Sequence, residues 1–361
     1  RTSPRTDSEN PSAMLDPHLI NDPFGDPGVF LELRHRKEAF LLDMGDLTSL
    51  PPRKILKVTH AFVTHTHMDH FIGFDHFLRV SLGRDQKVHL FGPPGFMNNV
   101  EGKFGAYTWN LVENYTNRLH FLVTEAGGSR RKTARYDCSR GFRKESAGES
   151  EANGDLLVDR DDLTVRGVLL DHKVPCLALA IEEKRHIHIK RNALDEMNLP
   201  VGPWLGELKR SILRNDPDGM EIEVRGRRAD WESSGLRFPL GLLRDRIVRI
   251  AAGEKVAYVA DAVYSEENRR KIVELAAGAR VLIVEAPFLH EDRERAFQKF
   301  HLTAAQAGSL AREAGAKNLV VYHFSPMYRS REDELVREAR EAFRGSFPDV
   351  EDCLSEMPPD L

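Results

Sequence analysis

Short apolar runs that end in turn residues recur along the chain and predict strands. Each run mixes β-branched or aromatic residues with glycine, proline or charged residues at its ends. The predicted strands cover 28–33, 38–43, 60–64, 87–92, 163–170, 176–182, 255–261, 279–285 and 318–323. Because helical patterns separate many of these runs, the sequence predicts an α/β protein.

Four segments have the apolar spacing of amphipathic helices. They cover 70–82, 265–278, 303–314 and 332–343. In the clearest of them, 303–314, we expect Thr303 to cap the N-terminus and Gly315 to end the helix.

Two polar stretches predict loops. The stretch 125–155 is rich in glycine and serine and has no apolar periodicity, which indicates a surface insertion or disorder. The stretch 184–217 also reads as loop-like. Candidate site residues lie on both sides of each stretch, so we predict one domain over 15–345 with an insertion at about 125–155 and an arm at about 184–217. We set 1–14 aside as a disordered or artificial leader, and 346–361 is the C-terminal tail.

Composition narrows the class of protein without naming a function. The chain has 361 residues, of which 41% are hydrophobic, enough for a sizeable core. No apolar run approaches the roughly 20 residues that span a bilayer, and no secretory signal is seen. Three widely spaced cysteines argue against a disulfide framework and predict a reducing, cytoplasmic location. The net charge of −4 gives no global sign of nucleic-acid binding, so such binding would depend on local patches.

The strongest chemical signal is the segment HTHMDH, which follows an apolar strand. His65 and His67 are two apart and point the same way at a strand end, so they can reach one ion together. Asp69 and His70 lie where the chain turns into a helix and can face a second ion. Further ligand-type residues, His172, Asp261 and His323, end later apolar strands. Imidazole and carboxylate together suit zinc or manganese.

This order of motifs resembles the metallo-β-lactamase superfamily and, within it, the ribonuclease Z family, endonucleases that mature tRNA 3′ ends. Supporting segments are LLDMG (41–45), LLDHKVPCLALAIEEK (169–184), LPVGPWLGELKR (199–210) and VVYHFSPMY (320–328). The resemblance implies an α/β (α+β) fold of the αββα type, a four-layer sandwich of two mixed β-sheets flanked by helices. It also implies a hydrolase that removes the 3′ trailer of precursor tRNA, and a homodimer.

The resemblance further assigns roles to residues. His65, His67 and His172 would hold one Zn²⁺, and Asp69, His70 and His323 the other, with Asp261 between them; Mn²⁺ or another divalent metal is an alternative. The pair would acidify a water toward a pKa of about 7, which supplies hydroxide for attack at phosphorus. Asp69 would also orient this nucleophile. Glu285 and His301 would deliver a proton to the leaving oxygen. Alternatively, Glu285 is an ordinary carboxylate at a strand end and His301 is simply the residue that precedes a helix N-cap.

Asp43 is either a carboxylate that orients a ligating histidine or an ordinary turn-initiating residue. Two basic regions are candidates for RNA contact, although charge runs are usually solvated surface. One is the cluster of seven cations over 130–144. The other is the arm, whose candidate substrate-binding residues are Lys184, Arg185, Lys190, Arg191, Gly202 and Pro203.

Several segments depart from the family pattern. The opening reads LINDPFGDPGVFLEL, without the usual glycine-rich loop, and the motif at Asp261 reads VADAVY. These departures keep open a second function, hydrolysis of a small phosphodiester, thioester or lactone. A third reading, an inactive metal-binding scaffold, conflicts with the complete ligand set.

Overall fold

The computed structural model describes residues 14–34, 36–226, 236–347 and 350. Its contacts group the chain into two compact units. The first unit comprises Arg1–Leu157, Val165–Ile181 and Lys255–Leu361. The second unit comprises Val158–Thr164 and Glu182–Glu254.

One sheet of eight strands is built from the first 151 residues, with its strands in sequence order from β1 to β8. The strands are β1 (Leu15–Leu19), β2 (Val29–Leu33), β3 (Ala39–Leu42), β4 (Val58–Phe62), β5 (Gln86–Gly92), β6 (Leu119–Glu125), β7 (Arg130–Asp137) and β8 (Lys144–Glu151). Strands β3 to β6 pair in parallel, and the flanking pairs are antiparallel. The helices between these strands are α1 (Pro52–Ile55), α2 (Met68–Phe71), α3 (Phe74–Ser81) and α4 (Phe96–Gly105), with the 3₁₀ turn η1 (Val112–Asn114).

A second sheet has six strands in the order β18-β17-β16-β11-β10-β9. These are β9 (Leu156–Asp159), β10 (Leu163–Asp171), β11 (Pro175–Glu183), β16 (Lys255–Val259), β17 (Val281–Glu285) and β18 (Leu319–Tyr322). The last three pair in parallel through the helical crossovers that parallel pairing requires. These crossovers contain α8 (Glu266–Ala276), α9 (Arg293–Gln298) and α10 (Ala304–Glu313), and the chain continues into α11 (Glu332–Arg344); the 3₁₀ turns are η3 (His290–Asp292) and η4 (Pro326–Tyr328).

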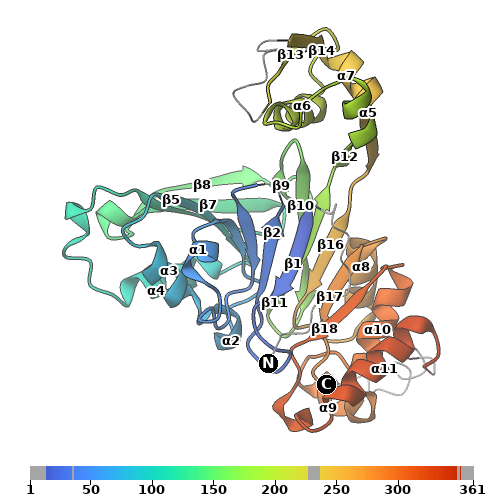
Figure 1. Cartoon of the computed structure of the whole chain (residues 1–361). Helices are drawn as coiled ribbons and strands as arrows, with labels where there is room; N and C mark the ends of the chain where they lie inside the picture. The colour runs from blue at the N-terminus through green and yellow to red at the C-terminus, as the bar shows by residue number, and fades with distance from the viewer. Residues whose placement is uncertain (1–13, 35, 227–235, 348–349, 351–361) are drawn as a thin grey trace. The chain divides into compact units, whose positions relative to one another are not determined.

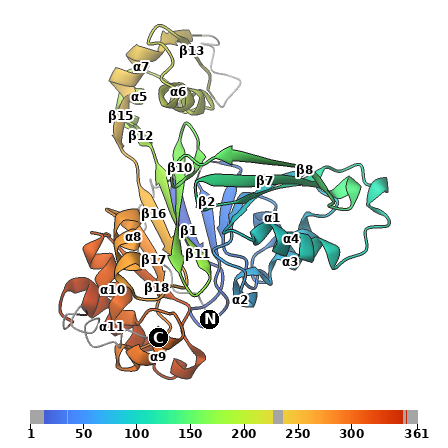
Figure 2. The same ribbon diagram turned by 180° about the vertical axis from the view of Figure 1, so that it is seen from behind.

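In the first unit, central strands of both sheets are buried on both faces, as in a sandwich. On β3, Leu41 packs in a cluster with residues of α3 and α4, while its neighbours Phe40 and Leu42 on the opposite face are also fully buried. On β16, Val259 packs with α8 and α10, and Tyr258 on the other face is equally buried. Figures 1 and 2 show α3 and α4 outside one sheet, and α8, α10 and α11 outside the other. The predicted αββα fold is confirmed.

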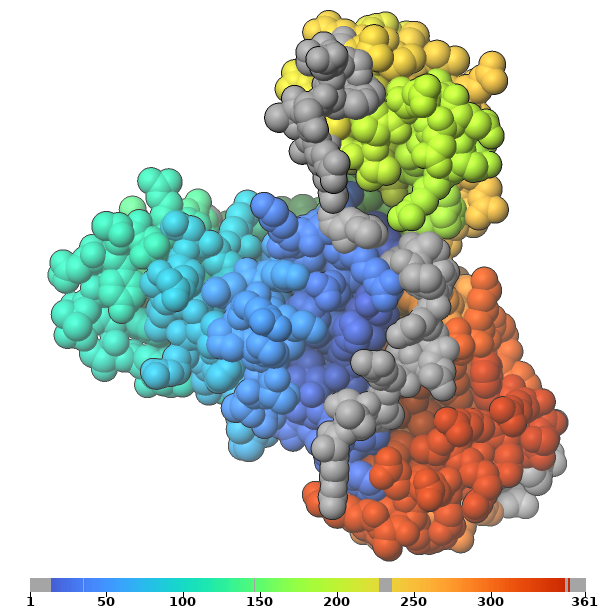
Figure 3. Space-filling model, in the orientation of Figure 1, coloured from blue at the N-terminus to red at the C-terminus, as the bar shows by residue number. Residues whose placement is uncertain are grey.

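The first sheet comes from the N-terminal part of the chain, and the second combines strands from its middle and its C-terminal part. In the space-filling view, the N-terminal part of the first unit, in blue and cyan, and the C-terminal part, in orange and red, occupy different sides (Figure 3). A hydrogen bond of 2.8 Å from the Leu177 N–H to the Thr64 carbonyl joins β11 to the loop after β4. Strand ends of both sheets are therefore brought to one place.

The second unit has a small core of its own. It contains the ribbon of β12 (Arg185–Ile189) with β15 (Val248–Ala252), the pair β13 (Glu221–Val224) with β14 (Leu236–Pro239), and the helices α5 (Arg191–Glu196), α6 (Trp204–Leu213) and α7 (Leu240–Ile247). Apolar side chains from these elements, such as Leu194, Trp204, Ile222 and Leu243, form one cluster. This local core accounts for the second unit's compactness.

All nine predicted strands and the four predicted helical segments are present, with shifted ends. Thr303 caps α10 in a full capping box with Gln306, and Gly315 takes φ 63° after it. The helix predicted over 70–82 is divided into α2 and α3 at Gly73.

Two predictions of loops are wrong. The stretch 125–155 contains β7, β8 and the 3₁₀ turn η2 (Cys138–Arg140), and 184–217 contains β12, α5 and α6. In β7, Ala134 and Tyr136 are buried in the core cluster while the residues between and before them are mostly polar, so the apolar signal is too short to detect. The predicted leader lies outside the described residues except for Met14, and of the predicted tail only 346, 347 and 350 are described.

Candidate metal centre

The HTHMDH segment leaves β4 and enters α2, which spreads its ligand-type side chains over one short turn. His67 takes an extended conformation at the N-cap of α2, and Asp69 and His70 lie within this helix. His65 is 2% exposed and His70 is fully buried. The imidazoles of His65 and His67 approach to 2.8 Å between Nε2 and Nδ1.

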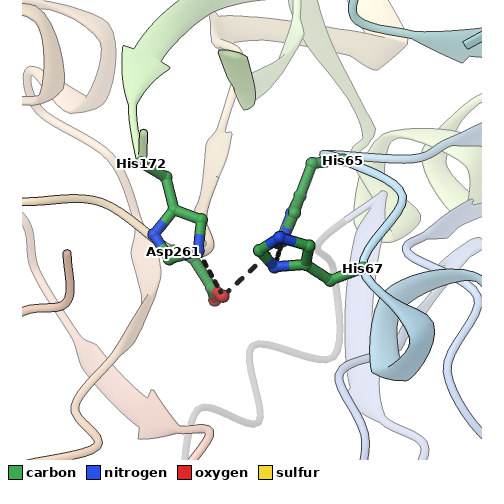
Figure 4. Close-up of side chains that lie close together, drawn as sticks. All are labelled: His65, His67, His172 and Asp261. Atoms are coloured by element: carbon green, nitrogen blue, oxygen red, sulfur yellow. Dashed lines mark hydrogen bonds and ion pairs between the residues drawn. The ribbon is translucent and has the colours of Figure 1, made fainter. Parts of the chain in front are cut away.

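Later strand ends of the second sheet supply the other side chains. His172 follows β10, Asp261 follows β16 and His323 follows β18. Figure 4 shows His65 and His67 converging from one side, and His172 and Asp261 from the other. Potential ligand atoms of these four residues lie within 4.8 Å of one another.

Asp69, His70 and His323 form a second group, also within 4.8 Å. The Asp69 Oδ2 atom is 3.2 Å from His323 Nε2 and 3.7 Å from His70 Nε2. Each of the two histidines therefore has a ring nitrogen beside the Asp69 carboxylate.

The carboxylate of Asp261 lies between the two groups and presents one oxygen to each. Oδ2 is 3.4 Å from His172 Nε2 and 3.7 Å from His65 Nε2. Oδ1 is 3.4 Å from His70 Nε2 and 3.0 Å from His323 Nδ1. A carboxylate in this position can bridge two cations.

Buried polar atoms at this site fit bound cations. Among the described residues, His70 Nε2, His323 Nδ1 and Asp261 Oδ1 are buried and make no hydrogen bond, although they lie beside one another. Buried polar atoms seldom lack a partner, and a metal ion would provide one. The donor set of imidazoles and carboxylates suits Zn²⁺ or Mn²⁺.

The electrostatics favour positive charge at the same place. Burial, together with the charge of His70, lowers the pKa of His65 to about 2, so its imidazole is neutral as a ligand must be. Burial opposes ionisation of Asp69, but its hydrogen bond with His323 and the charge of His70 lower its pKa to about 2. Burial also opposes protonation of His70, yet the carboxylates of Asp261 and Asp43 raise its pKa to about 10.

The Asp43 carboxylate lies behind His70 and contacts its ring. The Asp43 carboxylate is completely buried and accepts hydrogen bonds from the Thr64 N–H (2.7 Å), the Thr64 hydroxyl (3.0 Å) and the Tyr258 hydroxyl (2.8 Å). It lies 2.9 Å from His70 Nδ1, which leaves Nε2 for the centre. His172 is held similarly, with Nδ1 2.7 Å from the Phe300 carbonyl oxygen. Such partners fix the tautomer and direction of a ligating imidazole.

Glu285 and His301 form the pair expected from the sequence. Glu285 Oε2 is 2.7 Å from His301 Nδ1, and Oε1 accepts the N–H groups of Ala262 and Leu302. Burial would lower the pKa of His301, but the Glu285 carboxylate outweighs it and raises this pKa. The His301 ring lies beside the centre, with Nδ1 4.0 Å from Asp261 Oδ2.

Backbone strain accompanies these residues. Seven non-glycine residues of the described chain have positive φ, and four of them are at or next to the site: Asp43 (58°), Lys173 (61°), Phe300 (59°) and His323 (62°). Such conformations are costly for residues with a side chain and concentrate where function fixes geometry.

The residues predicted for the arm all lie in the second unit, where several have local partners. Lys184 Nζ is 2.6 Å from Asp159, and Arg185 donates to Asn215 at 2.9 Å. Lys190 Nζ is 3.5 Å from the Arg246 carbonyl oxygen, Arg191 begins α5, and Pro203 is the N-cap of α6. A Cβ atom on Gly202 would lie 2.1 Å from the Arg225 carbonyl oxygen, so this glycine is required by close backbone approach.

The basic stretch 130–144 belongs to the first unit, where nearby glutamates form ion pairs with several of its cations. Arg130 pairs with Glu149 at 3.1 Å and Arg140 with Glu145 at 2.9 Å. Lys144 pairs with Glu101 at 2.6 Å. These ion pairs weaken the case for this stretch as an RNA-binding surface.

Three partners of the site were not expected from the sequence: Thr64, Tyr258 and the Phe300 carbonyl. Thr64 directly precedes His65 and gives a weak positional signal. Tyr258 lies inside an apolar strand, and a backbone carbonyl carries no sequence signal at all.

Comparison with known proteins places the chain. It is 30% identical over 337 residues to Ribonuclease Z of Deinococcus radiodurans, which covers 91% of this chain and 96% of the relative. The chain belongs to the ribonuclease Z family. It is also 28% identical to Ribonuclease Z of Rippkaea orientalis, with 88% of each chain covered. No protein-family model matches the chain.

A solved structure supports the same fold. The metallo-β-lactamase fold protein YhfI of Bacillus subtilis superposes with a TM-score of 0.51 at 14% identity, covering 91% of this chain and 94% of the other. Family and fold together confirm the predicted metal-dependent hydrolase. Within the described residues, no helix has the length and apolar character to cross a membrane.

Proposed function

We propose that this member of the ribonuclease Z family is the endonuclease that removes the 3′ trailer from precursor tRNA, using two divalent cations. The observation that carries the proposal is Asp261, whose two carboxylate oxygens face two separate groups of ligands. Two-metal sites of this kind serve in-line displacement at phosphorus. The curated relatives named Ribonuclease Z support the choice of substrate.

In this proposal, His65, His67 and His172 hold one cation, and Asp69, His70 and His323 hold the other, with Asp261 shared. The cations are Zn²⁺, with Mn²⁺ as an alternative, two per subunit. When bound, they supply an acidified water and stabilise charge on the phosphodiester oxygens.

The chain's own residues orient the nucleophile and move the proton. The Asp69 side chain is 41% exposed and lies 3.7 Å from His70 Nε2, so it contacts both solvent and the second group of ligands. It can therefore orient or deprotonate the attacking water. The Glu285 carboxylate raises the pKa of His301, which favours the protonated imidazole, and this ring can give its proton to the leaving oxygen. Asp43 holds His70 in its ligating tautomer.

We further propose that the second unit contains the arm that contacts tRNA, within a single functional domain over 15–345. Lys184, Arg185, Lys190 and Arg191 supply its positive charge near Gly202 and Pro203. The expected assembly is a homodimer in the cytoplasm.

The decisive test is cleavage of a precursor tRNA with a 3′ trailer by the purified protein with Zn²⁺ or Mn²⁺. We expect a single cut after the discriminator base, which is lost in Asp69→Ala and retained in the matched Asp75→Ala. Asp75 lies nearby on α3, where it pairs with Lys103 at 2.7 Å. Failure to cut this RNA, with Asp69-dependent hydrolysis of a small chromogenic phosphodiester, would replace the proposal with the small-substrate alternative.

A further inference from the structure

Lys173 is a cation beside the centre that the proposed function does not use. It directly follows the candidate ligand His172, and its side chain is exposed. Its ammonium lies 5.8 Å from the centroid of the Phe300 ring. Within the part of the chain that the structure describes, no carboxylate is paired with this ammonium.

The backbone at both residues is held in an unusual conformation. Lys173 has φ 61° and Phe300 has φ 59°, in a region that favours glycine. The Lys173 N–H donates to the Asp171 carboxylate at 2.8 Å, which fixes the turn. A glycine at position 173 would relieve the strain, so a lysine here raises the question of what its side chain contributes.

The two strained turns carry residues of the site. Lys173 follows His172, while Phe300 precedes His301 and its carbonyl oxygen lies 2.7 Å from His172 Nδ1. The contact between the ammonium and the ring therefore lies at the edge of the centre, between a metal ligand and the proposed proton donor. A cation over an aromatic face is attracted by the ring and held in place.

The charges around the centre indicate which group the Lys173 ammonium would bind. The carboxylates of Asp69, Asp261 and Glu285 converge on the centre. The positive charge of metal ions bound there would therefore be used largely to neutralise the negative charge of these carboxylates. An RNA strand brings one further negative charge with every phosphate. A lysine at the edge of the centre is suited to a neighbouring phosphate, because its ammonium acts as a point charge on a flexible stem.

We propose that Lys173 binds a phosphate of the substrate strand next to the scissile one, and that Phe300 is the positioning residue that holds its ammonium ready. This inference rests on the proposed function in taking RNA as the substrate. The competing explanation is that the lysine and the ring merely fasten the two turns together.

The experiment compares Lys173→Gly with wild type on precursor tRNA. Glycine suits φ 61°, so this variant should keep the fold, and its melting temperature measures any loss of stability directly. We expect kcat/KM to fall about tenfold, mostly through KM, as for loss of one charge-assisted contact. Lys173→Arg should retain most of the activity. Lys317→Ala is the matched control, because Lys317 is exposed just before β18, at the other end of the strand from His323.

Salt dependence separates a phosphate contact from a structural role. Removing one contact should make the slope of log kcat/KM against log salt shallower by about 0.7 to 0.9. Phe300→Leu alone should increase KM by part of the amount that Lys173→Gly does. Added to Lys173→Gly, the same substitution should increase KM hardly any further.

An unchanged KM and salt slope in Lys173→Gly would overturn the inference, as would a loss of melting temperature that accounts for the whole effect. Wild-type cleavage of precursor tRNA is scored separately and decides the proposed function. If wild type fails there, the same comparison on metal-dependent cleavage of a short single-stranded RNA still decides whether Lys173 binds phosphate.

Discussion

Replacing Asp43 by asparagine tests whether one buried carboxylate controls the second ligand group. Asp43 accepts three hydrogen bonds from Thr64 and Tyr258 and lies 2.9 Å from His70 Nδ1. Asparagine keeps the shape and tolerates positive φ, but its amide nitrogen is a donor and cannot accept from these groups. At least one buried donor is then left without an acceptor, which costs about 1–3 kcal/mol.

The loss of metal affinity in Asp43→Asn should be larger than the loss of folding stability alone explains. Without the carboxylate, His70 loses the partner that fixes its tautomer and increases its basicity, and losses of this kind weaken metal affinity about 10- to 100-fold. We would titrate the metal-free protein with Zn²⁺ against a competing chelator, and measure unfolding of the metal-free protein in urea. Asp43→Asn should bind one of two ions more weakly and cleave substrate more slowly at limiting metal.

Asp137→Asn is the matched control. Asp137 is another buried aspartate of the first unit, and its carboxylate accepts from the N–H and hydroxyl of Ser139. This variant should lose stability without a change in metal affinity. If Asp43→Asn binds both ions as tightly as wild type, the carboxylate does not orient His70, and our reading of this network is wrong.

Three further predictions concern stability and the metal. Gly308→Ala should destabilise the fold by about 1–3 kcal/mol with metal affinity unchanged, as seen in urea unfolding, because the new Cβ would lie 2.2 Å from the Ala339 carbonyl oxygen between α10 and α11. Burial raises the pKa of Glu338 to about 7, so its carboxyl is more easily protonated in the folded state and wild-type stability falls as the pH rises from about 4.5 through 7. Melting curves should therefore show that the free energy of unfolding of Glu338→Gln, relative to wild type, is higher at pH 8 than at pH 5 by on the order of 1 kcal/mol. An equal difference at both pH values would contradict this. Chelation should abolish hydrolysis and lower the melting temperature, and Zn²⁺ at 100 times its Kd should restore about 2.7 kcal/mol; full activity after verified metal removal would exclude metal catalysis.

Strands with a continuous apolar pattern were predictable from the sequence, and those without it were not. The run at 279–285 becomes β17, in which all five residues are buried, and its residues 281–284 form a continuous apolar stretch. In contrast, β8 reads KESAGESE and has no apolar pattern; it joins the eight-stranded sheet through its backbone pairing with β7 and through exposed ion pairs such as Arg130–Glu149. Hydrogen bonds between main chains stabilise such an edge strand regardless of its side chains, so its sequence resembles a loop.

The same contrast holds within the candidate metal centre. His65, His67, Asp69 and His70 are close in sequence, so their proximity is almost guaranteed by the local chain. The sequence marks His172, Asp261 and His323 as ligand-type residues at strand ends, but their grouping with the first four residues follows from the resemblance. The local sequence does not show that the ends of β10, β16 and β18 meet. The support behind the ligands was the hardest to foresee, since Tyr258 reaches Asp43 across 215 residues of chain.

This distance explains why the two halves of the sandwich have to dock before the site exists. Asp43 and Thr64 follow strands of the first sheet, and His70 lies in α2 beside it. Tyr258 lies in β16 of the second sheet, and Asp261 and His323 follow its strands. The hydrogen bond from Tyr258 to Asp43 and the two-faced contacts of Asp261 cross the same interface. Bound cations would add ligand bonds from both sheets, so metal binding and closure of the sandwich should stabilise each other. A chain in which the sheets pack imperfectly would therefore lose metal affinity before it loses secondary structure.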